Sequence, residues 1–299
     1  MSNKKLAAIA MLGTVVIWAG YAVIARNIVQ IFPPFSVLFL RMGIGSLCFI
    51  PFLIRFKPWK KKSFKKLLLT SLYAAVNVSF YIIGIKFTSA SVSHLIYAAI
   101  PILIIISGSL FRNEKYSLHK WIGVVIGLMG LFYIMYRSSI ERGTTITGTL
   151  LGNLLVGIAM VGWMIWIIRS KTFSKEFTPL EIAGVSCLVS FFVSIILAIL
   201  EIIITKPTFI LTPDIVLAGL YLGAGGTFLT YLLYQYAISK VSSFSASLTS
   251  YLQPVATTVF ASYFIGEKVN TSFFIGGMMV LLGVFVTQVH LVKRYLDRR

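Results

Sequence analysis

Acidic residues are scarce in this 299-residue sequence, which contains 8 Asp and Glu against 27 Lys and Arg. Charged residues of both signs make up 12% of it, whereas soluble domains carry about 25%. The low charge therefore argues against an ordinary soluble domain. Hydrophobic residues make up 58%, which excludes a disordered chain. They also argue against a soluble nucleic-acid-binding protein, despite the net charge of +19, because a soluble surface could not hide so much hydrocarbon.

Cysteines and the sequence motifs of catalysis are also scarce. The two cysteines, Cys48 and Cys187, each lie inside an apolar run, which excludes a disulfide-stabilised scaffold and indicates packing residues. The three histidines are scattered, and neither a zinc-protease, a nucleophile-elbow nor a Walker A motif occurs. We therefore expect no enzyme, no metal site, no organic cofactor and no ATP-driven transport within this chain.

Long apolar runs are what the sequence has instead. A helix that crosses a bilayer needs roughly 17–25 mostly apolar residues. The runs are continuous rather than alternating, which favours helices over barrel strands. The sequence therefore predicts an all-α integral membrane protein with ten transmembrane helices, at about 6–26, 34–54, 66–86, 91–111, 118–136, 146–168, 180–203, 214–238, 242–264 and 271–291.

The basic residues are distributed unevenly between the two sides that these helices define. Ten helices place both termini on one side, and 20 Lys and Arg fall on that side against 6 on the other. Cytoplasmic loops of membrane proteins carry the excess of Lys and Arg. The sequence thus predicts a multi-pass protein of the cell membrane with both termini in the cytoplasm.

The two halves of the chain resemble each other. Residues 80–132 align with 233–285 at a constant offset of 153, with 14 identities in 53 positions, and Pro101 falls on Pro254. Glu114-Lys115 falls on Glu267-Lys268 in the same alignment. We infer two five-helix repeats, which an odd helix number makes inverted in the membrane. Their predicted bounds are 1–137 and 146–291, followed by a basic cytoplasmic tail at 292–299.

These repeated motifs resemble those of the EamA-type family of the drug/metabolite transporter superfamily. The residues that carry the resemblance are Pro101, Phe111, Glu114, Lys115, Gly123 and Gly130, and Pro254, Phe264, Glu267, Lys268, Gly276 and Gly283, together with Trp18 and Phe39-Leu40-Arg41. The resemblance implies a ten-helix carrier that exports small metabolites, amino acids or drugs. The superfamily also includes importers and exchangers.

Aromatic, amide and hydroxyl residues recur at helical spacing on helices that the repeat relates to each other. We expect them to line a substrate cavity between the repeats, which suits amphipathic and zwitterionic ligands; helix packing is the alternative reading. Pro101 and Pro254, each in the middle of a run, are candidate hinges or static bends. The candidate substrate-binding residues are Trp18, Tyr21, Asn77, Tyr81, His94, Tyr97, Trp163, Trp166, Tyr231, Tyr234, Gln235 and Tyr251.

Ionisable groups inside the runs are few. Arg41 lies about two turns, roughly 10 Å, inside the second run. It either binds an anionic substrate or has a structural role, tied to backbone carbonyls or reaching toward the interface. His94 is either a proton carrier or a hydrogen-bonded packing residue. No Asp or Glu lies at the centre of a run, so coupling to protons through a buried carboxylate is not expected; Glu181 and Glu201 are the nearest substitutes.

The sequence thus predicts a secondary transporter that exports small amphipathic metabolites, such as amino acids or drugs, by alternating access. One alternative is an importer or exchanger of a metabolite or nucleotide-like solute, with Arg41 as its anion anchor. A membrane enzyme or sensor is a remote alternative. The expected partners are a small-molecule substrate and the lipid bilayer, with no nucleic acid, and the expected state is a monomer or weak dimer.

Overall fold

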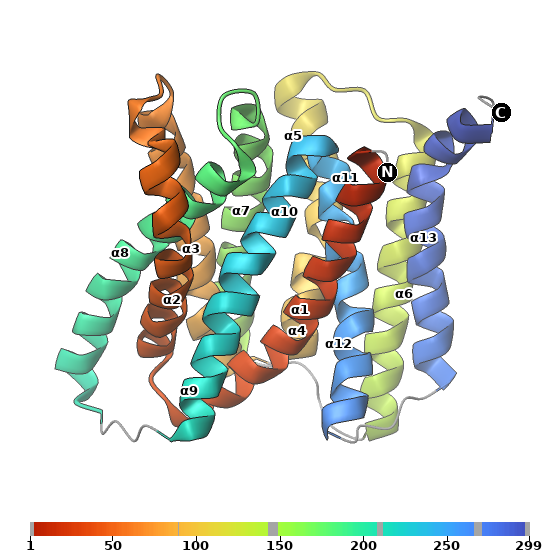
Figure 1. Cartoon of the computed structure of the whole chain (residues 1–299). Helices are drawn as coiled ribbons and strands as arrows, with labels where there is room; N and C mark the ends of the chain where they lie inside the picture. Colours follow the sequence, from red (N-terminus) through yellow and green to blue (C-terminus); the bar gives the residue numbers. More distant parts are fainter. Residues whose placement is uncertain (1–2, 89, 143–148, 208–211, 266–270, 297–299) are drawn as a thin grey trace.

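The computed structural model describes residues 3–88, 90–142, 149–207, 212–265 and 271–296, and these residues form helices and no strand (Figure 1). Six helical segments are long and apolar enough to cross a membrane. They are α1 (Asn3–Ile31), α2 (Pro34–Phe56), α3 (Phe64–Phe87), α7 (Leu150–Phe173), α8 (Pro179–Thr205), and a continuous segment made of α9 (Pro213–Leu220), the π-helix η2 (Tyr221–Leu229) and α10 (Thr230–Lys240). The predicted runs at 6–26, 34–54, 66–86, 146–168, 180–203 and 214–238 are therefore confirmed as helices of membrane length, within a few residues at each end.

The remaining helices are α4 (Ala90–Tyr97), α5 (Ile100–Arg112), α6 (Leu118–Arg142), α11 (Ser243–Ser247), α12 (Thr249–Ile265), α13 (Thr271–Leu296) and the short η1 (Pro58–Lys60). Residues 292–296 of the predicted tail continue α13. The predicted loop pair Glu267-Lys268 lies outside the described residues.

Two runs that were predicted as single helices are each broken in two. The run 91–111 divides into α4 and α5 at residues 98–99, just before Pro101. Proline has no N–H to donate, so it fits the first turn of a helix and interrupts the ladder before it. The run 242–264 divides at Leu248, and Pro254 lies inside α12.

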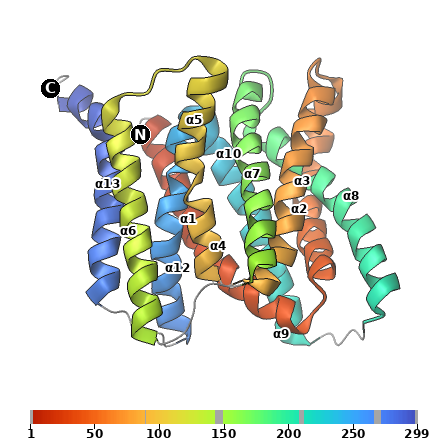
Figure 2. The same ribbon diagram turned by 180° about the vertical axis from the view of Figure 1, so that it is seen from behind.

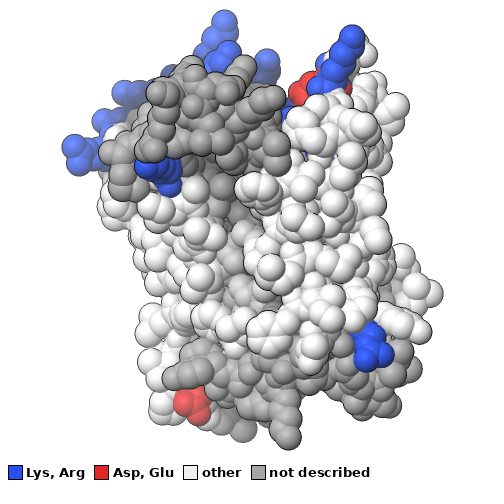
Figure 3. Space-filling view, turned by 90° about the vertical axis from the view of Figure 1, so that its right-hand side faces the viewer, with Lys and Arg blue, Asp and Glu red and all other residues white. Residues whose placement is uncertain are grey.

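The loops alternate between two ends of the bundle. The start of α1 and the end of α13 lie at the same end, together with the α2–α3, α5–α6, α7–α8 and α10–α11 connections (Figures 1 and 2). Figure 3 shows that Lys and Arg gather at this end of the visible face. We call it the basic end.

Helices α6 and α13 approach closely through glycines. A Cβ atom on Gly283 would lie 2.5 Å from the backbone nitrogen of Gly127, and one on Gly130 would lie 2.6 Å from the carbonyl oxygen of Gly276. Small residues allow helix backbones to touch in this way within membranes, where dispersion contacts drive association.

The two carboxylates that the sequence offered for proton coupling both have structural roles. Glu201 accepts hydrogen bonds from the backbone nitrogens of Phe35 (3.2 Å) and Ser36 (2.9 Å), which caps the start of α2. Glu181 forms a capping box with Thr178 and an ion pair of 2.7 Å with Lys61. Both carboxylates therefore satisfy helix ends.

The glycine contact between α6 and α13 predicts a stability difference. Gly283→Ala places a methyl group against backbone that cannot yield, and we expect a loss of about 1–3 kcal/mol. Gly157→Ala on α7 is the control, because its Cβ would meet no atom within 4 Å; alanine there should be neutral or gain up to about 1 kcal/mol. Thermal unfolding of the purified protein in detergent measures both. Equal melting temperatures would show that the helices do not pack on these glycines.

Candidate functional site

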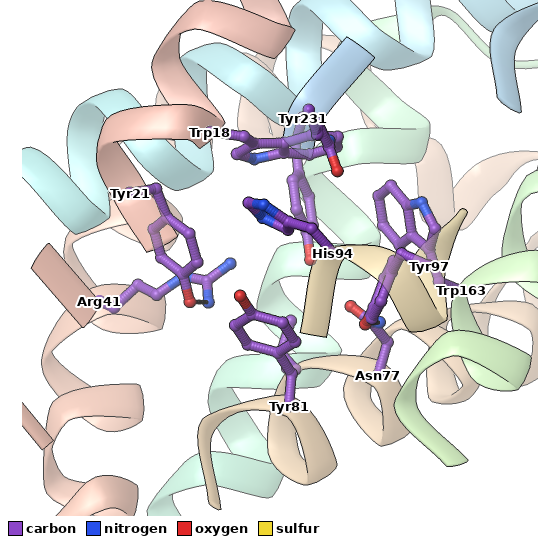
Figure 4. Close-up of a pocket in the computed structure, with 11 residues that line it drawn as sticks. Trp18, Tyr21, Arg41, Asn77, Tyr81, His94, Tyr97, Trp163 and Tyr231 are labelled. Carbon is purple, nitrogen blue, oxygen red and sulfur yellow. Dashed lines mark hydrogen bonds between the residues drawn. The ribbon is translucent and has the colours of Figure 1, made fainter. Parts of the chain in front are cut away.

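A cavity with about 510 Å³ of atom-free space lies inside the bundle, between helices of both halves of the chain (Figure 4). The helices α1, α2, α3, α4, α7, α10 and α12 each contribute to its wall. The lining residues are Trp18, Tyr21, Arg41, Asn77, Val78, Tyr81, His94, Tyr97, Trp163, Tyr231 and Gln253.

Aromatic rings form most of the wall and fix one another in place. The ring centroid of Trp163 lies 5.5 Å from that of Trp18 and 5.9 Å from that of Tyr231. Tyr81 meets Tyr97 edge to face at 5.7 Å. Contacts of this kind stabilise the positions of rings beyond the effect of burial alone. The cavity therefore presents a preorganised apolar surface.

The guanidinium of Arg41 supplies the positive charge in the wall. The residue is 4% exposed, and its Nε donates to Oγ1 of Thr227 at 2.7 Å. Nη1 donates to the Tyr21 hydroxyl, and the guanidinium carbon lies 4.5 Å from the centroid of the Tyr21 ring. These bonds go to side-chain hydroxyls of two other helical segments, α1 and η2. Within the described ranges, neither Asp nor Glu forms an ion pair with Arg41.

The π-helix η2 brings Thr227 to this position. Thr227 Oγ1 donates to the carbonyl oxygen of Leu222, five residues earlier, at 2.8 Å, while it accepts from Arg41. A Cβ atom on Gly223 would lie 2.5 Å from Ile44 and 3.1 Å from the Arg41 carbonyl oxygen, so only glycine lets η2 approach α2 this closely. Wide helical turns occur frequently at functional sites.

Amide, hydroxyl and imidazole groups complete the wall. Asn77 Nδ2 donates to the Tyr97 hydroxyl and to the carbonyl oxygen of Ala159 at 2.9 Å. His94 Nδ1 lies 3.1 Å from Oγ1 of Thr257 on α12. This bond connects α4 to α12, and Figure 4 shows the imidazole facing the cavity.

Eight of the twelve predicted substrate-binding residues line the cavity: Trp18, Tyr21, Asn77, Tyr81, His94, Tyr97, Trp163 and Tyr231. Trp166 and Tyr234 lie behind the wall, stacked on Trp163 at 4.6 and 5.4 Å. Tyr251 lies against Gly127 and donates to the Val124 carbonyl oxygen at 3.1 Å. Gln235 is fully buried away from the cavity, and its amide has no hydrogen-bond partner among the described residues.

Two of the four residues that do not line the cavity, Trp166 and Tyr234, differ from their neighbours in depth. A helical stripe fixes the face on which a side chain lies, but each turn moves it by 5.4 Å along the axis. Trp166 and Tyr234 are nearly one turn beyond Trp163 and Tyr231, toward the basic end. The stripes therefore predict the face of each helix but not the depth of these two residues along it.

Sequence reasoning missed two lining residues, Val78 and Gln253. Val78 is an apolar residue inside an apolar run and carries no signal. Gln253 could have been found, because it directly precedes Pro254 and falls on Ile100 at the repeat offset of 153. The polar side chain at a position whose repeat partner is apolar is the signal that could have singled it out.

A bundle of apolar helices that encloses an aromatic cavity with polar groups is the arrangement of a membrane transporter. The chain belongs to the EamA-like transporter family, whose model matches residues 5–136 and 150–289. The resemblance seen in the repeated motifs is thus confirmed, and the protein is a multi-pass membrane transporter. Membership in a transporter family also agrees with the expectation that it is not an enzyme.

Individual relatives are distant but nearly full-length. The uncharacterized transporter YoaV of Bacillus subtilis is 23% identical over 296 residues, which covers 95% of this chain and 98% of its own. An uncharacterized transporter of Archaeoglobus fulgidus is 24% identical over 282 residues, which covers 92% of this chain and 94% of the relative. A WAT1-related protein of Arabidopsis thaliana is 23% identical, and the match covers 100% of this chain and 96% of the relative. A crystal structure with 18% identity superposes with a TM-score of 0.76 over 97% of this chain and 98% of that chain, which supports the fold alone.

The bond between Arg41 and Thr227 predicts an unequal effect of two matched substitutions. Thr227→Val leaves Nε of a buried guanidinium without an acceptor, and we expect the free energy of unfolding to fall by about 1.5–3 kcal/mol. Thr230→Val is the control, because Thr230 is equally buried on the same segment but donates to backbone carbonyl oxygens, of Gly226 at 2.7 Å and of Thr227 at 3.5 Å. Thr230→Val should lower the free energy of unfolding by about 0.5–1.5 kcal/mol. The measurement is thermal unfolding in detergent, and equal losses would contradict the role of Thr227.

Proposed function

We propose that this transporter is a secondary carrier that exports small amphipathic metabolites bearing a carboxylate, amino acids among them, by alternating access. The observation that carries the proposal is a buried guanidinium in an aromatic cavity, with no described acidic residue to neutralise it. The apolar part of the solute would lie against the rings, and its carboxylate would lie against Arg41.

The burial of Arg41 supports the carboxylate. A charge removed from water costs several kcal/mol unless a partner compensates for it, and ionisable groups at membrane depth usually have functional roles. The two hydroxyls that Arg41 contacts satisfy Nε and Nη1 but carry no charge. Figure 4 shows the guanidinium beside the Tyr21 ring, among the residues that line the cavity. A bound carboxylate would therefore supply the missing negative charge and gain a strong hydrogen bond.

The charge of the cavity also favours one class of anion. Arg41 is the only Lys or Arg among the described lining residues, so a single carboxylate balances the site. A nucleotide-like solute with several phosphate charges would be left largely uncompensated. Monoanions and zwitterions thus fit better, and the aromatic faces can accept an ammonium group through cation–π contacts.

The arrangement of the chain supports alternating access between two inverted repeats of five helices, at 1–137 and 146–291. The family model matches once in each half, and both halves contribute to the cavity wall. The interrupted pairs α4–α5 and α11–α12 lie in corresponding parts of the two halves, with breaks at residues 98–99 and at Leu248 that precede Pro101 and Pro254. Broken helices around a site between repeats are typical of secondary transporters, and these breaks are the candidate hinges.

We place the basic end in the cytoplasm of a cell membrane, because cytoplasmic loops carry the excess of Lys and Arg. Export of the solute is the direction that this family resemblance favours. Uptake or exchange of the same class of solute is the second candidate function, because a carboxylate can be bound by Arg41 in either direction.

A charge-matched series of solutes tests the proposed substrate class. On a phenyl skeleton the members are 3-phenylpropionate, phenylalanine, 3-phenylpropanamide and phenethylamine, and analogous sets use indolyl and linear aliphatic skeletons. Within at least one set, we expect the acid and the zwitterion to raise the melting temperature of the wild type more than the amide or the amine does. Carboxylates that are no better than their amides in every set would contradict the role of Arg41.

Substitutions at Arg41 connect this preference to the residue. Arg41→Gln should weaken carboxylate binding on the order of 10- to 100-fold, the value of a hydrogen bond to a charged group. Arg41→Lys should retain part of the preference. Arg26→Gln is the control, because Arg26 lies outside the cavity and donates to the Lys86 carbonyl oxygen at 3.3 Å. Flux in proteoliposomes then tests the carrier itself: the absence of protein-dependent flux for any bound solute would refute the transport proposal while leaving the binding result intact.

A further inference from the structure

A second cavity lies at the basic end and shares no lining residue with the central one. It comprises about 1510 Å³ of atom-free space, part of which is open to the surroundings. Three lysines from three different helices meet there: Lys120 in the first turn of α6, Lys171 in the last turn of α7, and Lys240 at the end of α10. We call it the lysine cavity.

The three ammonium groups of the lysine cavity have no acidic partner among the residues that the structure describes. Lys171 Nζ donates to the carbonyl oxygens of Ile238 (2.6 Å) and Ser239 (3.1 Å) at the end of α10. Lys120 Nζ lies 5.2 Å from the ring centroid of Tyr116, and Lys240 Nζ lies 5.8 Å from that of Tyr236. These contacts position the ammonium groups, but they leave three positive charges without a counter-ion.

The acidic residue nearest in sequence to Lys120 is already engaged. Glu114 forms an ion pair with Arg112 at 3.3 Å and accepts a hydrogen bond from the Tyr116 hydroxyl. Burial and this hydrogen bond raise the pKa of Tyr116 to about 12, so the phenol is uncharged at neutral pH. Neither residue therefore offers a free negative charge to the lysine cavity.

The rest of the lysine cavity is apolar and reaches the outer surface of the bundle. Its wall includes Leu12 of α1, Leu252 of α12 and Val284 of α13, and Leu12 is 55% exposed. Leu12 lies nine residues from the start of α1 at the basic end, or about 14 Å along the helix. The serines Ser242 and Ser245 lie near the lysines. The site is thus basic and hydroxyl-bearing at one end and hydrocarbon-like along its length.

This gradient of polarity matches one class of ligand. The lysines lie at helix ends, at the depth where phospholipid head groups meet water. Each Lys or Arg near an anionic membrane surface attracts it by about 1 kcal/mol. We propose that the lysine cavity binds an anionic phospholipid of the leaflet at the basic end, with its phosphate on Lys120, Lys171 and Lys240 and an acyl chain along Leu12, Leu252 and Val284. The proposal does not depend on which solute the central cavity carries.

Lipid retention by the purified full chain tests the proposal. Native mass spectrometry in detergent compares phosphatidylglycerol with phosphatidylcholine of the same chains, and with glycerol 1-phosphate, which carries the charge without the chains. We expect phosphatidylglycerol to remain bound, whereas the other two do not. Equal retention of phosphatidylcholine would overturn the role of charge, and saturating binding of glycerol 1-phosphate would show a site for a soluble anion instead.

Matched charge removal assigns the binding to the lysine cavity. Lys120→Gln with Lys240→Gln should reduce the affinity for phosphatidylglycerol about 30-fold, from the loss of two of its three ammonium groups. Lys60→Gln with Lys62→Gln is the control, because it removes the same charge from exposed positions at and just after η1. The two double variants should differ by at least 10-fold; equal affinities would overturn the proposed location.

A milder set of measurements keeps the test decisive if the double variant does not fold. Lys240 is exposed, so Lys240→Gln alone should fold and should weaken phosphatidylglycerol binding about 5-fold. Wild-type binding should also fall as salt rises, because the Debye length shrinks from about 10 Å at 0.1 M to 3 Å at 1 M. Phosphatidylglycerol binding that is unchanged both by Lys240→Gln and by the rise in salt would overturn the proposal.

Discussion

The functional centre depends on one constraint, the burial of a guanidinium inside a bundle of apolar helices. Arg41 can remain charged there only while its N–H groups are bound and its charge is compensated. Two side chains meet the first need: the Tyr21 hydroxyl from α1 and the Thr227 hydroxyl from η2. The bond from Arg41 to Thr227 requires Thr227 to approach α2, which the π-helical turns and Gly223 make possible. The irregular backbone of the eighth apolar run thus places Thr227 where it binds Arg41.

The scarcity of acidic residues has a physical meaning in this setting. A carboxylate at the centre of the bundle would form an ion pair with Arg41 and occupy the place that we assign to the solute. The described acids instead serve helix ends: Glu201 caps α2, and Glu181 closes its own capping box and binds Lys61. The same logic applies to the lysine cavity, where the lining residues carry three positive charges and no negative ones. Both cavities therefore carry positive charge without a described acidic partner, which is why we propose an anion for each, one small and one with long chains.

The sequence predicts the helices well and the site only in part. A helix must be long enough to cross the bilayer, so the six segments that are long and apolar enough could be predicted directly from the length of the apolar runs. The breaks at residues 98–99 and at Leu248 could not be placed, because where a hydrogen-bond ladder is interrupted depends on packing as well as on proline. The π-helix has no periodic signature at all. Helical stripes placed Trp163 and Tyr231 on the correct face but did not separate them from Trp166 and Tyr234, since depth within the bundle is set by tertiary contacts.

The central claim is that a bound solute completes the charge balance of Arg41. An experimental structure of the protein with 3-phenylpropionate tests it most directly, because it locates the carboxylate and the ring in one measurement. The account predicts a carboxylate oxygen within about 3 Å of the Arg41 guanidinium, with the phenyl ring between Trp18, Trp163 and Tyr231. A ligand whose carboxylate points away from Arg41, or a guanidinium found paired with an acidic residue of the chain itself, would contradict the account.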